Sequence, residues 1–427
     1  MTTVSTVITM ADTTDAATGA APKQPKVTRR RLLTGGALVA GGALSAAGIT
    51  AGLSGAASSS RDREPSPTSF GEQVEPFYGP HQAGIATPAQ AHASFVAFDL
   101  QPGVDRAALG RLMRLWTDDA ARLTQGQPPL ADTEPELAVL PARLTITFGF
   151  GRGLLQAAGL DDQWPDAVGS LPSFSVDRLQ PRWSGGDLLI QICADDPVTV
   201  SHAQRMLIKD SRPFATVRWI QQGFLRSRGA HQEGQTQRNL LGQLDGTTNP
   251  KPGTPEFDAA VWVSEGPEWL RGGSTLVLRR IRLDLDDWDR LGRVEKEYVL
   301  GRRLDNGAPL TGVEEHDPPD FDAIDESGLY VIPEFSHIRR AHVPDPRLRM
   351  FRRFYNYDQA LGADGQAEAG MIFAAYQADV QRQFVPVQRK LAEADLLNKW
   401  TIPIGSAVFA IPPGCEPGGW IGERLLA

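Results

Sequence analysis

One polar turn carries the residue types that proton-transfer chemistry needs. Residues 239–250 read Asn-Leu-Leu-Gly-Gln-Leu-Asp-Gly-Thr-Thr-Asn-Pro, so Asp245 stands between Gly242 and Gly246. Glycine tolerates a positive φ and lets the backbone approach a bulky ligand, and a positioned carboxylate can take up and return a proton. The turn therefore indicates an acid/base aspartate aimed at a ligand, although Gly-x-x-Asp-Gly by itself is also typical of ordinary loops.

Two segments further along the chain supply candidate partners for this aspartate. His337 lies in the string Phe-Ser-His-Ile-Arg, and the pair Arg352-Arg353 follows it. A neutral imidazole nitrogen is the usual ligand of haem iron in peroxidases, with its other nitrogen donating to a carboxylate. A nearby arginine can stabilise a developing anion. Most single histidines are plain core or surface residues, and only this context distinguishes His337 among the seven histidines.

At this point the chain resembles the dye-decolourising peroxidases, in their exported branch associated with iron uptake. The likeness spans most of residues 76–415 and rests on segments that occur in the family's order. These are residues 77–85 (FYGPHQAGI), 144–151 (LTITFGFG), the Asp245 turn, 336–339 (SHIR) and the Arg352-Arg353 string. The resemblance implies an α+β fold in which two ferredoxin-like domains form a dimeric α+β barrel. It also implies haem b, bound without a covalent link, one per chain.

The resemblance assigns roles to individual residues. His337 becomes the proximal ligand of the haem iron, Asp245 the distal acid/base and Arg352 the distal arginine. Other positions that it places against the haem are Gly246, Thr247, Thr248 and His342.

The interval between His337 and Arg352 departs from the family pattern. Where the family has an Asn-Pro-Arg triplet that contacts the haem, this chain reads His342-Val343-Pro344, and the interval is shorter. The pair Pro346-Arg347 is a candidate replacement for that contact. The departure leaves Arg352 and Arg353 both open as the distal arginine, and Arg352 is preferred because it stands first in the matching string.

A carboxylate behind His337 is expected in the segment 393–400. Asp395 is the best candidate and Glu393 competes with it, while either could be a plain helix-surface acid. A charged partner would give the imidazole anionic character and stabilise oxidised iron.

The implied activity is the reduction of hydrogen peroxide with oxidation of dyes, phenols or other organic reductants. Asp245 would move a proton between the two peroxide oxygens, and Arg352 would stabilise the anion as their bond breaks. Because an unperturbed aspartate has a pKa of about 3.9, we expect an acidic pH optimum. Three other classes compete: a deferrochelatase-type protein that releases iron from haem, a non-catalytic haem-binding protein, and a non-haem enzyme of the same barrel superfamily.

Length and charge limit the partners. A chain of 427 residues suits two domains. The net charge is −8, and without residues 1–57 it is −11, from 38 basic and 49 acidic residues. Such a surface repels phosphate backbones, so no nucleic-acid partner is expected. Cys193 and Cys415 form no CxxC or CxxCH motif, which argues against a zinc site or a covalent haem. Two unpaired thiols are favoured over a disulfide.

The N-terminus has the features of an export signal. Residues 28–33 (TRRRLL) precede a run of small and apolar residues, 35–57, which together resemble a twin-arginine signal peptide over residues 1–57. Residues 58–75 are expected to form a flexible leader. We therefore expect export to a periplasm-like or extracellular space, without stable membrane insertion once the signal is removed. Iron-uptake components are candidate partners, and a homodimer is one option that the sequence leaves open.

Two βαββαβ halves are expected to position these residues, as domains 76–245 and 246–427. In the first half, periodicity predicts strands at 93–100, 144–150, 187–194 and 214–221 and helices at 106–125 and 198–209. Leu109, Leu112, Leu115 and Leu123 are expected to face the core. In the second half it predicts strands at 259–263, 273–285, 370–377 and 407–411 and helices at 287–301 and 381–393. Residues 304–347 read as a long insertion, and loops of that length are usually functional or disordered.

Overall fold

The computed structural model describes residues 69–232, 234–359 and 368–427. Its nine strands form an antiparallel sheet in the order β5-β9-β2-β3-β1-β4-β7-β8-β6, and β5 also pairs with β8, so the sheet closes into a barrel. The strands are β1 (His92–Leu100), β2 (Thr145–Phe150), β3 (Leu188–Ala194), β4 (Ala215–Phe224), β5 (Ser274–Leu283), β6 (Phe351–Arg352), β7 (Tyr355–Gln359), β8 (Glu368–Gln377) and β9 (Thr401–Ile411).

Each half of the barrel has the ferredoxin-like strand order. The first half runs β4-β1-β3-β2, and the second runs β7-β8-β5-β9. The seams are narrow, because β4 meets β7 through Phe224 and Asn356, and β2 meets β9 through Phe150 and Ala410. The expected α+β fold of two ferredoxin-like halves is confirmed, while a domain boundary at 245/246 stays a prediction.

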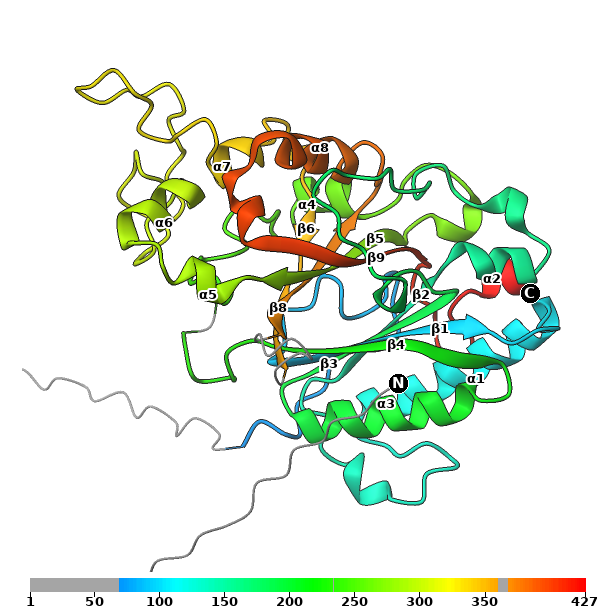
Figure 1. Cartoon of the computed structure of the whole chain (residues 1–427). Helices are drawn as coiled ribbons and strands as arrows, with labels where there is room; N and C mark the ends of the chain where they lie inside the picture. Colours follow the sequence, from blue (N-terminus) through cyan, green and yellow to red (C-terminus); the bar gives the residue numbers. More distant parts are fainter. Residues whose placement is uncertain (1–68, 233, 360–367) are drawn as a thin grey trace, which may run out of the picture. The chain divides into compact units, whose positions relative to one another are not determined.

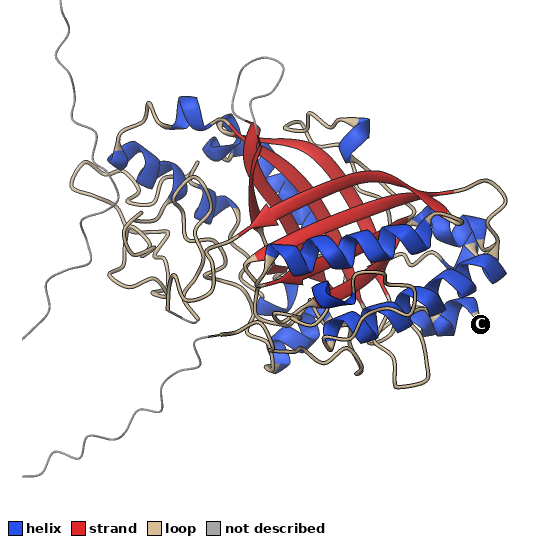
Figure 2. Cartoon of the chain, turned by 90° about the horizontal axis from the view of Figure 1, so that it is seen from below, coloured by secondary structure: helices blue, strands red, loops and turns tan. Residues whose placement is uncertain are grey.

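Two long helices cover the outer face of the first half. Figure 1 shows α1 (Arg106–Thr124) and α3 (Pro197–Ser211) side by side against β1, β3 and β4, and Figure 2 shows the pair in front of the strands. Each helix begins at an aspartate whose carboxylate accepts backbone N–H groups, Asp105 from Ala108 and Asp196 from Val198 and Thr199. Such capping is a standard way to satisfy the first turn.

The second half carries one longer helix, α8 (Phe384–Ala394), and several short ones. These shorter helices are α4 (Pro255–Val261), α5 (Leu285–Trp288), α6 (Arg293–Leu300), α7 (His337–Arg340) and α9 (Glu423–Leu426), while the short α2 (Arg152–Ala157) belongs to the first half. Within the described residues, no helix is both long enough and apolar enough to cross a membrane. Cys193 is buried and Cys415 is half-buried, and both are free thiols.

Three expectations about these elements are wrong. Residues 259–263 do not form a strand, because α4 covers most of them, with Pro255 in its first turn and the Thr254 hydroxyl accepting from Phe257. Instead of one helix over 287–301 there are two, because α5 ends at Trp288 and α6 begins at Arg293, after Gly292. Leu115 is 41% exposed and does not face the core.

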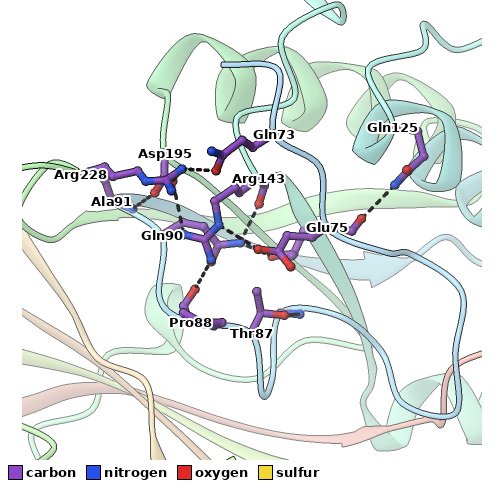
Figure 3. A network of polar contacts seen from close by, with 12 residues as sticks. Gln73, Glu75, Thr87, Pro88, Gln90, Ala91, Gln125, Arg143, Asp195 and Arg228 are labelled. Carbon is purple, nitrogen blue, oxygen red and sulfur yellow. Dashed lines mark hydrogen bonds and ion pairs between the residues drawn. The ribbon is translucent and has the colours of Figure 1, made fainter. Parts of the chain in front are cut away.

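The second part of the expected leader is packed rather than flexible. The Glu75 carboxylate pairs with the Arg143 guanidinium at 2.8 Å, and Arg143 also meets Asp195 at 3.4 Å (Figure 3). The backbone carbonyls of Gly71 and Gln73 accept from Ala142 and Arg143. Residues 69–75 are therefore part of the folded body. Residues 58–68 and the expected signal peptide lie outside the described residues.

The core has separate layers on the two sides of the sheet. On β1, Val96 and Phe98 face α1 and α3, whereas Phe95 and Ala97 face the barrel interior. This alternation follows from the twofold period of a strand. A smaller cluster, Phe174, Val277, Val380, Phe384 and Val385, lies under α8 on the outer face of the second half. That sparsely filled face is where the cavity described next is found.

Candidate active site

A cavity of about 210 Å³ lies on the outer face of the second half. It is bounded by α7 and α8, by β6 and by the loop that carries Asp245, and Figure 1 shows α7 and α8 as neighbours beyond β9. A second hollow of about 100 Å³ shares much of its lining and extends it inward to Asp395. The sequence-predicted residues that line the first cavity are Asp245, Gly246, Thr247, Thr248, His337, His342 and Arg352.

On one side of the cavity, a histidine is held by a buried carboxylate. Asp395 ends α8, and one of its oxygens accepts from the backbone N–H of Leu397 at 2.9 Å. The other oxygen contacts His337 Nδ1 at 2.7 Å. A carboxylate can only accept, so Nδ1 carries the proton and Nε2 keeps its lone pair for a ligand. The expected carboxylate position is therefore occupied by Asp395, and Glu393 is not the partner.

The charge of Asp395 also changes the basicity of His337. Burial disfavours the imidazolium, but the attraction and the hydrogen bond from Asp395 outweigh burial and raise the pKa of His337 above its ordinary value. The more basic imidazole is also the stronger ligand.

Asp245 and Arg352, which line the same cavity, form an ion pair. Asp245 Oδ1 lies 3.1 Å from an Arg352 guanidinium nitrogen, and the aspartate side chain is 8% exposed. The other oxygen, Oδ2, has Asn239 Nδ2 at 3.5 Å. Gly242 and Gly246 flank the turn with φ of +83° and +119°, values at which a side chain would strain the backbone.

Neighbouring arginines point into different environments. The backbone of Arg352 is fixed by the Asn249 amide, which accepts from its N–H at 3.2 Å and donates to its carbonyl at 2.7 Å. Arg353 is buried away from the cavity, where it donates to the Thr87 carbonyl and to the Gln90 side chain. Of the two candidates, the structure brings Arg352 to Asp245.

The cavity also contains cations that the sequence did not identify. Arg302 is 6% exposed, and its guanidinium donates to the carbonyls of Gly307 and Glu315. Burial lowers the pKa of Arg302, the charge of Glu315 opposes that shift and Arg352 adds to it. Arg349 also lines the cavity. No motif surrounds either arginine, so sequence patterns gave no signal for them.

Arg347, the candidate replacement for the family's haem contact, is not among the residues that line the described cavity. Arg347 pairs with its neighbour Asp345 at 2.9 Å, and its side chain is 75% exposed. Arg349 takes the place at the cavity instead. His342 lines the same region, where burial and then the charges of Arg349 and Lys390 lower its pKa. The short interval after His337 thus still places a cation at the cavity, but the cation is Arg349 and not Arg347.

The lining suits a haem. His337 offers a free imidazole nitrogen to iron, and Arg302 and Arg349 can offset the two carboxylates that a haem carries. Apolar side chains for the macrocycle are Ile338, Met350, Phe373, Val387 and Leu391. The residues present therefore fit the cofactor that the resemblance implies.

Comparisons with family models and known proteins show which family the chain belongs to. Residues 82–225 match the model for the N-terminal part of Dyp-type peroxidases, and residues 236–416 match the model for the C-terminal part. A dye-decolorizing peroxidase of Thermobifida fusca (strain YX) is 42% identical over 360 residues, 81% of this chain and 83% of the relative. A deferrochelatase of Yersinia pestis bv. Antiqua (strain Nepal516) is 37% identical over 373 residues, 83% of this chain and 85% of the relative.

Solved structures give the same result. A DyP-type peroxidase from Cellulomonas bogoriensis superposes with a TM-score of 0.81 at 49% identity, covering 84% of this chain and 99% of that one. Ferric DtpA from Streptomyces lividans superposes with a TM-score of 0.81 at 43% identity, covering 85% and 99%. The chain belongs to the Dyp-type peroxidase family, whose members are haem enzymes that act as peroxidases.

Proposed function

We propose that this chain is a haem b peroxidase that reduces hydrogen peroxide and oxidises dyes, phenols or other organic reductants. His337 is the iron ligand, Asp245 the acid/base and Arg352 the anion-stabilising cation. The observation that carries the proposal is that one cavity is lined both by the Asp395-bound imidazole and by the Asp245–Arg352 pair.

The side chains of this cavity divide the chemistry between them. A bound haem supplies the iron that binds peroxide and changes oxidation state. Asp245 takes the proton from one peroxide oxygen and delivers it to the other. Its Oδ2 is suited to this, because Oδ1 is engaged by Arg352 while Oδ2 has only the 3.5 Å contact to Asn239 among the described residues. The Arg352 guanidinium stabilises negative charge as the O–O bond breaks.

The wider assignment follows the same reasoning. We infer that the haem is haem b, as the resemblance implies, and that it is held without a covalent link because the sequence has no CxxCH motif. One haem per chain is expected, because this cavity offers one imidazole paired to a carboxylate. The signal-like segment 1–57 supports twin-arginine export, and the relatives named deferrochelatase support iron-uptake components as partners. A homodimer remains a prediction.

A second function has a specific observation in its favour. Relatives at 37% identity carry the name deferrochelatase, and His337 would hold the haem in that activity too. We infer that the two activities can be distinguished by the products that they form. Incubation of the haem-loaded protein without peroxide would yield fluorescent iron-free porphyrin if iron is released. The peroxidase proposal expects the macrocycle to keep its iron and a dye to be oxidised when peroxide is added.

The proposal is tested by replacing the acid/base. In Asp245→Asn, with haem content matched to the wild type, we expect the bimolecular rate constant for the reaction with peroxide to fall by about 10²–10⁴-fold. Stopped-flow absorbance of the haem band measures it. The exposed Asp162→Asn serves as a control with unchanged rate. An Asp245→Asn protein that reacts at the wild-type rate would remove the acid/base role.

A further inference from the structure

The loop that carries Asp245 is a hairpin-like turn whose two ends meet. Its arms pair through Arg238 and Leu244, and the backbone N–H of Asp245 donates to the Gln237 carbonyl at 2.9 Å. Thr236 lies at one end of this turn and Thr247 at the other. Movement between the two ends would therefore tilt the aspartate within the cavity.

A single carboxylate oxygen holds both ends. Glu315 Oε1 accepts from the Thr236 hydroxyl at 2.5 Å and from the Thr247 hydroxyl at 2.9 Å. Hydrogen bonds to an ionised acceptor are shorter and stronger than neutral ones. Glu315 is half-buried, and it forms no ion pair with a side chain in the part of the chain that the structure describes. Its charge is thus directed at the two hydroxyls.

The same residue joins the turn to the long insertion and to a cavity arginine. Glu315 belongs to the segment 304–347, whose Pro319 and Phe321 line the cavity. Its backbone carbonyl accepts from Arg302 at 2.8 Å. Arg302 and Arg352 both line the cavity with Asp245, and the negative charge of Glu315 acts on Arg302.

We propose that Glu315 is a positioning residue for the reaction with peroxide: its carboxylate latches the insertion onto both ends of the 236–247 turn and so fixes Asp245 beside Arg352. This inference rests on the proposed role of Asp245. It assigns the long insertion a purpose, which is to close and brace the acid/base side of the cavity. Because a displacement of about 1 Å can cost about 10²-fold in rate, loss of the latch should be visible in the chemistry.

The test compares five variants at matched haem content. Glu315→Ala should lower the rate constant for peroxide by about 10–100-fold, and Glu315→Gln, which keeps the accepting oxygen, should restore it to within about fivefold of wild type. Thr247→Val should lower the rate by less than Glu315→Ala. Combining the two substitutions should change the rate little further, because Glu315→Ala already removes the hydrogen bond that Thr247→Val removes. Glu314→Ala removes the exposed neighbouring charge and should have no effect.

Several outcomes would overturn the proposal. A Glu315→Ala protein that reacts at the wild-type rate would do so, as would equal losses in Glu315→Ala and Glu315→Gln or a full additive loss in the double variant. If Glu315→Ala takes up no haem, the double variant Thr236→Val/Thr247→Val decides by the same rate criterion. The oxidation of dye by protein already treated with peroxide should be unchanged in each variant, which a general loss of structure would not allow.

Asp245→Asn separates this inference from the proposed function. If Asp245→Asn is impaired and Glu315→Ala is not, the latch is wrong and the acid/base role stands. If Asp245→Asn is unimpaired, the acid/base role itself fails. If both are impaired, Glu315→Ala should add less than twofold in the Asp245→Asn background, because there is then no acid/base to position.

Discussion

The two halves of the barrel share a strand order but use their outer faces differently. In the first half, α1 and α3 press apolar side chains such as Trp116 and Leu207 against the sheet, and the face is solidly filled. In the second half, α8 is the one longer helix on the corresponding face among the described residues, and the small apolar cluster beneath it lies beside the cavity. The chain that would supply a second covering helix is instead the run of short helices and loops from α5 to β6.

This difference shows how one fold provides both a scaffold and a site. Where the crossover between strands is a long helix, it fills the face. Where the crossover is the run of short helices and loops from α5 to β6, it delivers His337, Arg302 and Glu315 to the open face as separate polar groups. Stability should therefore depend mainly on the first half and chemistry on the second.

Truncating the filled face should have the largest energetic effect. Trp116 is fully buried, its indole N–H donates to the Leu207 carbonyl at 3.0 Å, and it stacks on Phe148. Trp116→Ala should lower the free energy of unfolding by about 3–5 kcal/mol. Urea denaturation of the haem-loaded protein measures this. The peroxide rate per bound haem should not change, and a parallel loss of that rate would mean that the halves are not independent.

The adjacent arginines at the end of β6 sharpen the same contrast between two consecutive residues. Arg352→Leu should lower the peroxide rate constant by about 10²–10³-fold, about 3–4 kcal/mol, with little change in stability. Arg353→Leu should instead lower the stability and leave the peroxide rate constant almost unchanged. The Arg353 guanidinium donates to the Thr87 carbonyl and to Gln90 in the interior, and its removal leaves these buried groups without a partner, at a cost of about 1–3 kcal/mol. Stopped-flow kinetics and denaturation of both variants measure the two effects. The opposite pattern would make Arg353 the distal arginine.

A smaller effect concerns charge on the filled face. Asp210 on α3 lies beside Asp119 on α1, and burial, followed by hydrogen bonding to and repulsion from Asp119, raises the pKa of Asp210 from 3.8 to about 8. A raised folded-state pKa gives stability that is complete below pH 3.8 and is lost as the pH rises through 8. Asp210→Asn should remove that loss.

The melting temperature across pH 4–9 measures this prediction. Wild type and Asp210→Asn should agree near pH 4, and the variant should be more stable by about 1 kcal/mol or more near pH 9. A constant difference across the range would show that the two carboxyls do not share a proton. In the second half, by contrast, the buried carboxylates Asp245 and Asp395 have a cation or imidazole as partner.

The sequence predicted those cavity residues that belong to a motif or that such a residue requires as a partner. Asp245 was visible because two glycines frame it, and Asp395 because a ligand histidine calls for a carboxylate. Arg302, Arg349 and Glu315 were not predicted, because their roles depend on contacts between segments that are distant in the sequence. Such contacts leave no local sequence pattern. Glu315 in particular stands between Glu314 and His316 in a run of polar residues.

The fold errors have equally local causes. Residues 259–263 looked like a strand from their valines and tryptophan, but the Thr254-Pro255 start signal of a helix decided the outcome. Leu115 fits a helical period yet lies on the edge of the buried stripe, where a period alone does not fix the facing direction. The sequence predicted a flexible leader up to residue 75, whereas the folded body already includes residues 69–75. The ion pair between Glu75 and Arg143 forms only in the folded chain, so the sequence alone does not indicate it.

The proposed function depends most directly on His337 as the group that binds the haem iron. His337→Ala should purify with little haem and without the haem absorption band, and added imidazole should restore both by entering the vacated space beside Asp395. His342→Ala, which removes another imidazole from the same cavity, should keep normal haem content. The absorption spectrum and haem content of the two purified variants give the answer. A His337→Ala protein with a wild-type band and full haem content would contradict the account.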